Sequence, residues 1–124
     1  MKELYQKISD LIAKLSSVRN SIAADGKKFT ITDAWNLFQT GLAEIITAIE
    51  ATLTDTSGAD KKAIALQYAE QFYDKVIVNI DIPYVPNLVE PIVDKLLKQL
   101  FMYLANGAID AIVTLLNKLG VFKG

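Results

Sequence analysis

The chain has 124 residues, enough for one domain with its own core, and 52% of them are hydrophobic. It contains no His and no Cys, which excludes disulfides, thiolate or imidazole catalysis and Cys/His zinc sites. Thirteen basic and 14 acidic residues give a net charge of −1, so no overall field favours nucleic acid or an anionic membrane. A chain this apolar and this weakly charged is expected to cover part of its surface with other copies or a partner.

Residues 4–22 carry the clearest helical pattern. Their apolar residues recur at alternating spacings of four and three, which is a heptad seam of nearly three repeats. The seam consists of Leu4, Ile8, Leu11, Leu15, Val18 and Ile22. Tyr5 and Ile12 widen the stripe, which favours a bundle of several helices over a two-stranded coiled coil.

A second helix is predicted after the turn signal Asp25-Gly26. Thr30 with Asp33 matches a capping box, and Phe29 is placed to staple it. The expected apolar stripe is Trp35, Phe38, Leu42, Ile45 and Ile49. Residues 29–60 hold five acids and no base, whereas residues 1–28 hold six bases and three acids. The first two helices are therefore complementary in charge, as antiparallel neighbours would be.

A third helix is predicted from about Ala59 to Val78, with Ser57 and Asp60 as its cap. Its apolar residues in line are Ile64, Tyr68, Phe72 and Val76. The β-branched run at 76–80 favours an extended end to this helix.

Residues 81–87 contain Pro83 and Pro86 and cannot be helical throughout, so a stiff strap is predicted there. Beyond it, only seven of the last 37 residues are charged. On one continuous helix the polar residues form a narrow stripe of Lys95, Gln99, Asn106, Asp110 and Asn117. Asn106-Gly107 can also end a helix, which leaves one helix, or two over 88–105 and 108–119, as alternatives.

These elements predict a single all-α domain over residues 1–124, a helical bundle of four to five helices. Within it, residues 1–80 form a three-helix bundle, 81–87 the proline-rich strap, and 88–122 an apolar C-terminal helix or helix pair.

No residue pattern indicates catalysis or a cofactor. No nucleophile-elbow glycines surround any Ser, and no Gly-rich phosphate loop is present. Residues 25–33 superficially resemble a calcium loop, but Thr32 stands where a bidentate Glu is needed. The basic pairs Lys27-Lys28 and Lys61-Lys62 are short and typical of a solvated helix face. We therefore predict a non-enzyme with no catalytic, metal or cofactor site, and no nucleic-acid partner is indicated.

The candidate interaction residues lie on the strap and in the apolar C-terminal region. Tyr84, held between two prolines, either presents an amphipathic ring to a partner at low entropic cost or packs back onto the helices of its own domain. The full set is Tyr84, Leu88, Ile92, Leu96, Phe101, Asp110, Ile112 and Leu116. The predicted partner is a second copy of the chain or a larger protein assembly. In such an oligomer Asp110 fixes the register with the partner copy; the alternatives are that it lines the interior of a membrane bundle or faces water in a monomer.

Two other functions compete with this prediction. Residues 99–117 hold a single charge and are long enough to span a bilayer. However, a mid-helix Asp costs about 3 kcal/mol to insert, and no aromatic belt or basic flank compensates, so a membrane is not favoured. A helical bundle could also bind a small ligand with Trp35, Phe38, Tyr68 and Phe72, although aromatic residues at helical spacing are typical of a plain core.

The N-terminal residues indicate whether the sequence carries a signal peptide, and hence where the protein is located. Asp10 and Lys14 interrupt its apolar residues, so no signal peptide is evident. The segment Asp25-Gly26-Lys27-Lys28-Phe29-Thr30-Ile31-Thr32-Asp33-Ala34 resembles the interhelical turn of small helical accessory proteins of tailed bacteriophages. That resemblance implies a virion or assembly component, and we expect a cytoplasmic or virion location.

Overall fold

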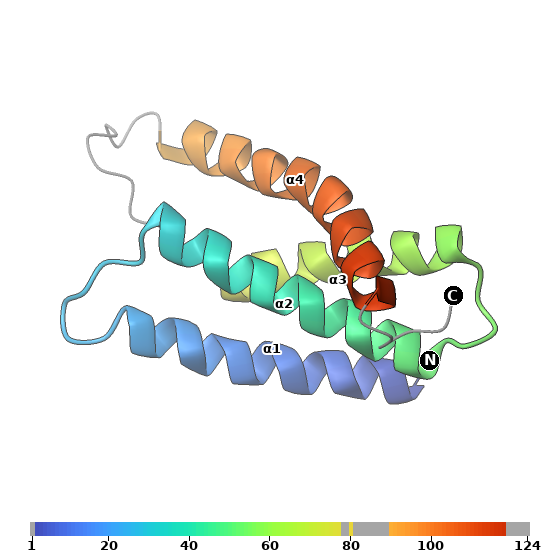
Figure 1. The fold of residues 1–124 in the computed structure, drawn as a ribbon. Helices are drawn as coiled ribbons and strands as arrows, with labels where there is room; N and C mark the ends of the chain where they lie inside the picture. Colours follow the sequence, from blue (N-terminus) through green and yellow to red (C-terminus); the bar gives the residue numbers. More distant parts are fainter. Residues whose placement is uncertain (1, 78–79, 81–89, 119–124) are drawn as a thin grey trace.

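The computed structural model describes residues 2–77, 80 and 90–118. Within these ranges the chain forms four helices and no strand: α1 (Lys2–Ile22), α2 (Ile31–Thr52), α3 (Gly58–Val76) and α4 (Glu90–Lys118) (Figure 1). The predicted all-α class is confirmed. The predicted proline strap lies outside the described residues.

The C-terminal region is one helix, because α4 runs without a break through Asn106-Gly107. A glycine ends a helix by adopting a positive φ. Among the described residues only Asp25 and Gly26 have positive φ, at 58° and 77°. The predicted turn after α1 is therefore present, whereas Gly107 keeps the helical conformation.

The starts of α2 and α3 follow the predicted caps. The Thr30 side chain accepts a hydrogen bond from the Asp33 N–H at 3.1 Å, and the Asp33 carboxylate accepts one from the Thr30 N–H at 3.2 Å. This reciprocal pair is the capping box. The Ser57 hydroxyl accepts from the Asp60 N–H at 3.2 Å and caps α3.

Helices α1 and α2 are antiparallel neighbours, and α3 contacts both (Figure 1). The ammonium of Lys14 on α1 lies 2.8 Å from the Glu44 carboxylate on α2, an ion pair between the two segments whose charges are complementary. Helix α4 packs on α2 and α3, and no contact between α4 and α1 occurs in the described part of the chain. Helix α2 therefore has three neighbours and α4 has two.

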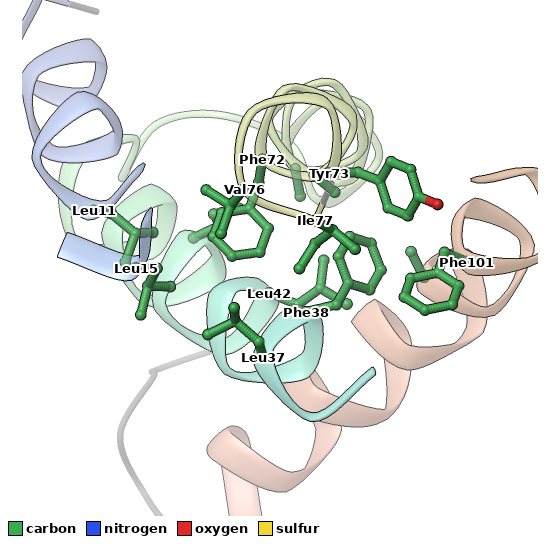
Figure 2. Packing of buried hydrophobic residues seen from close by; sticks show 14 of the residues in the cluster. Leu11, Leu15, Leu37, Phe38, Leu42, Phe72, Tyr73, Val76, Ile77 and Phe101 are labelled. Carbon is green, nitrogen blue, oxygen red and sulfur yellow. The ribbon is translucent and has the colours of Figure 1, made fainter. Parts of the chain in front are cut away.

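The core centres on α2. Phe38, Leu42 and Ile45 are fully buried, and the ring of Phe72 from α3 lies directly against the backbone of α2 at Gly41. A Cβ at Gly41 would lie 2.6 Å from the Phe72 Cζ, so this position requires glycine for steric reasons. Figure 2 shows Phe72 and Phe38 side by side in this layer.

The buried face of α3 agrees with the predicted one at Phe72 and Val76 and differs from it in the first half of the helix. The large residues Ile64 and Tyr68 are only partly buried, whereas the buried residues are Ala65, Ala69, Phe72, Tyr73 and Val76. Small residues let two helices approach closely, so α3 turns its alanines inward. The helix ends at Val76, two residues before the predicted end, within the β-branched run.

Candidate interaction surface

The inner face of α4 belongs to the core. Phe101, Ala105 and Ile109 are at most 2% exposed. The Phe101 ring lies 5.4 Å from Phe38, 5.3 Å from Tyr73 and 5.4 Å from Trp35, measured between centroids, and Figure 2 shows it directed from α4 toward the aromatic residues of α2 and α3. Phe101, which we predicted as an interaction residue, therefore contributes to folding of the single chain and is not available on the surface.

Two sets of ion pairs connect α4 with α3. The Lys98 ammonium lies 2.9 Å from Asp74 and 4.0 Å from Glu70, and its hydrogen bond to Asp74 raises the pKa of Lys98. The Lys62 ammonium lies 2.8 Å from Asp110. These contacts are partly solvated, so they orient α4 more than they stabilise it.

The outer face of α4 carries a line of exposed apolar side chains, here called the α4 stripe: Ile92 (61% exposed), Leu96 (57%), Leu100 (49%), Tyr103 (77%) and Leu104 (39%). Their spacing of four, four and three to four residues places them on one side of the helix. Gly107 and Ala111 continue the same side as small residues. Elsewhere in the described chain the large exposed apolar residues are Tyr5, Val18 and Ile31, separated along α1 and at the start of α2.

The far end of the stripe is hollowed. A shallow depression of about 620 Å³ is lined by Lys62, Tyr103, Leu104, Gly107, Asp110 and Ala111, among others. A Cβ placed on Gly107 would meet no atom within 4 Å. Packing within the described chain therefore gives no reason for glycine here, in contrast to Gly41.

A second hollow, of about 460 Å³, lies between α2, α3 and α4. Its apolar floor includes Ile46, Ile49 and Ile109, and its rim carries Lys61 and Lys62. Both lysines already have acidic partners on this surface, since Lys61 lies 3.0 Å from Glu50 and Lys62 pairs with Asp110. The rim charges are thus neutralised internally, and this hollow has no feature that selects an anionic ligand.

Ile92 and Leu96 lie on the stripe, and Asp110 lies on its polar edge. Ile112 is partly buried and packs against the core. Leu116 belongs to α4, but its side chain lies outside the described residues, as do Tyr84 and Leu88 entirely. Sequence reasoning missed Leu100, Tyr103 and Leu104, although their spacing from Ile92 and Leu96 on one continuous helix would have revealed them.

Of the four aromatic residues considered as a ligand pocket, Phe38 and Phe72 lie in the core, and Trp35 and Tyr68 are partly buried against it. Phe38 and Phe72 are 0% exposed, with ring centroids 6.2 Å apart. Trp35 packs edge-on against Phe101. Trp35, Phe38 and Phe72 are thus in contact with other aromatic rings, as expected for a packed core.

One helix in the described part of the chain is long and apolar enough to span a bilayer: the segment Ile92–Thr114 of α4. Only 17% of the most apolar part of this segment is buried. No group of three or more acidic residues suited to a metal ion occurs in the described residues. Comparison with protein-family models, curated proteins and solved structures gave no match to this chain.

Proposed function

We propose that this protein is a structural subunit that associates with further copies of itself through the α4 stripe. The observation that supports this proposal is the alignment of five exposed apolar side chains, from Ile92 to Leu104, on one side of a helix whose other side is anchored in the core. Isolated exposed apolar residues are ordinary on protein surfaces, but a contiguous line of them is typical of an interface.

The area of the stripe fits this role. With about 200 Å² for a fully exposed side chain of this size, the exposed fractions amount to roughly 600 Å². That is at the upper end of the apolar patches on monomers and most of the ~800 Å² that each partner contributes to a standard interface. The polar residues beside the stripe would supply the rim.

A second copy fits the stripe better than lipid does. Helix α4 contains three acidic and three basic residues, so it has no excess of positive charge to attract anionic headgroups. Spanning a bilayer would also withdraw Phe101, Ala105 and Ile109 from the core that they share with α2 and α3. Membrane association therefore remains the alternative, supported by the length and composition of Ile92–Thr114.

The proposed role is non-catalytic, in agreement with a sequence that lacks His and Cys. The resemblance of residues 25–34 to the turn of phage accessory proteins extends the proposal to a component of a virion or of its assembly.

The proposal is tested by replacing Leu96 and Leu100 together by Lys. Both side chains are about half exposed, so the charged tips can remain in water and the fold should persist. We expect the wild-type protein to have a mass of two or more chains of 13.7 kDa at micromolar concentration, and the double variant to have the mass of one chain with unchanged helicity. Sedimentation and circular dichroism measure these two properties.

The matched control is Tyr5→Lys, at an exposed apolar position on α1, which should leave the mass unchanged. A monomeric wild-type protein would contradict the proposal. If that monomer floated with liposomes while the double variant stayed in the aqueous fraction, the stripe would be a lipid-binding surface instead.

A further inference from the structure

We infer that two copies of the chain pair antiparallel through the α4 stripe, about a two-fold axis between residues 101 and 102. The inference rests on the proposed self-association and specifies its geometry. In a two-fold interface, residue i of one copy meets residue j of the other and j meets i. With the axis at this point, Leu100 lies opposite Tyr103, Leu96 opposite Gly107, and Ile92 opposite Ala111 of the partner copy.

At both ends of the interface, this register matches large side chains to small ones. The N-terminal end of the stripe carries the exposed residues Ile92 and Leu96, and beyond its C-terminal end the same side of α4 carries Gly107 and Ala111 with the depression beside them. Antiparallel pairing places each large residue of one copy over the hollow of the other, at both ends of the interface. Complementary packing of this kind is what a stable interface requires.

The polar edge of α4 is matched in the same register. When two helices pair antiparallel, the residues along one edge of the contact face the residues along the same edge of the partner helix. The polar edge of one copy therefore faces the polar edge of the other, which brings Lys95 near Asp110 and Gln99 near Asn106 of the partner copy. Asp110 already pairs with Lys62 of its own chain at 2.8 Å. Lys95 of the partner would add a second cation beside the same carboxylate.

Parallel pairing lacks these matches. Parallel pairing about a two-fold axis brings the polar edge of one copy against the opposite edge of the partner, so Lys95 would not meet Asp110 of the partner copy. It would also place the large residues of both copies at one end and the small ones at the other, which leaves the two depressions facing each other unfilled.

Gly107 supplies independent support. A glycine within an exposed helix costs roughly 0.5–1 kcal/mol relative to alanine, and its Cβ position is open within the chain. The open space above Gly107 would receive Leu96 of the partner copy.

Because the chain has no Cys, single-cysteine variants test the register directly. Leu96→Cys and Gly107→Cys are made separately, mixed in equal amounts and oxidised. Random pairing of the two variants in a two-fold dimer should link about half of the chains as a 96–107 disulfide dimer. Each variant alone should give little linked dimer, because identical positions away from the axis lie far apart. Gln6→Cys on the exposed side of α1, mixed with Gly107→Cys, measures linkage by random collision.

The outcomes separate the inference from the proposed function. Efficient linkage of Leu96→Cys with itself, without linkage in the mixture, would overturn the antiparallel arrangement while leaving self-association in place. A dimeric mass with linkage of the mixture no higher than the Gln6 control would overturn this register. A monomeric mass for both variants and for the wild-type protein would overturn the proposed function as well. Circular dichroism verifies that each variant is folded.

Discussion

Helices α2 and α4 are both rich in apolar residues, yet the protein uses them differently. Helix α2 is surrounded by α1, α3 and α4 and buries eight residues, from Ala34 to Ile49. Helix α4 touches α2 and α3, and its buried residues in the described part are Phe101, Ala105 and Ile109. The difference lies in the number of neighbours rather than in the apolar content, so the surplus apolar surface of α4 is the part of the molecule available to a partner.

Gly41 of α2 and Gly107 of α4 also differ in how many neighbouring atoms surround them. Gly41 of α2 is required because the Phe72 ring occupies the space of a side chain. Gly107 of α4 has open space around it. A glycine in a helix is thus explained by intramolecular packing in one case, and in the other by the partner that we propose.

The largest expected effect is the difference in stability between a substitution on the buried face of α4 and one on its exposed face. Phe101→Ala removes a ring that contacts Trp35, Phe38 and Tyr73, and should lower the free energy of unfolding by about 3–5 kcal/mol. Tyr103→Ala, two residues away and 77% exposed, should change the stability of the monomer by less than about 0.5 kcal/mol. Urea denaturation at one fixed low protein concentration measures both values. Equal losses would mean that α4 has no distinct inner face.

The glycines give the next largest effect. Gly41→Ala should destabilise the protein by about 1–3 kcal/mol, because Phe72 is fully buried and has little room to move away. Gly107→Ala should instead stabilise the monomer by roughly 0.5–1 kcal/mol through higher helix propensity. Thermal unfolding should show a lower melting temperature for Gly41→Ala and a higher one for Gly107→Ala than for the wild-type protein. A stabilising Gly41→Ala would show that the contact between α2 and α3 is looser than the structure indicates.

A third effect is confined to high pH. Burial, and then the negative charges of Asp94 and Asp74, raise the pKa of Tyr73 from 10.0 to about 12. Between these values the unfolded chain loses the phenol proton while the folded chain keeps it, so stability falls as the pH rises. Below pH 10 the group is neutral in both states and contributes no slope. Tyr73→Phe should therefore weaken the alkaline loss of stability, as measured by urea denaturation at pH 9 to 12. Tyr5→Phe, at an exposed position on α1 outside the α4 stripe, is the control.

The smallest expected effect concerns the ion pairs that orient α4. Lys98→Gln removes the contacts with Asp74 and Glu70, but these groups are partly solvated, so the loss should be below about 1 kcal/mol. The contribution of the pair is present below the ordinary pKa of lysine and disappears as the pH rises through the raised pKa of Lys98. Lys75→Gln on the exposed side of α3 is the control in urea denaturation. A loss as large as that of Phe101→Ala would mean that charge, and not apolar packing, holds α4 in place.

Local features of the sequence predicted local structure well. The Thr30–Asp33 capping box, the Ser57 cap and the Asp25-Gly26 turn are set by neighbouring residues, and all three are present. The heptad seam of α1 also indicated its buried residues correctly from Leu4 to Leu15. Such features depend only on residues that are close together along the chain, so their spacing can be read from the sequence.

What the sequence by itself determined is therefore the all-α class, the caps and the apolar periodicity of each helix. For α3 and α4, only the tertiary structure decided which apolar side faces inward. It buried Ala65 and Ala69 more completely than Ile64 and Tyr68, placed Phe101 inside, and left Leu100 and Tyr103 outside. The physical reason is that hydrophobic burial is non-directional: on a helix that is apolar on most sides, the shapes and positions of the neighbouring helices select the buried face.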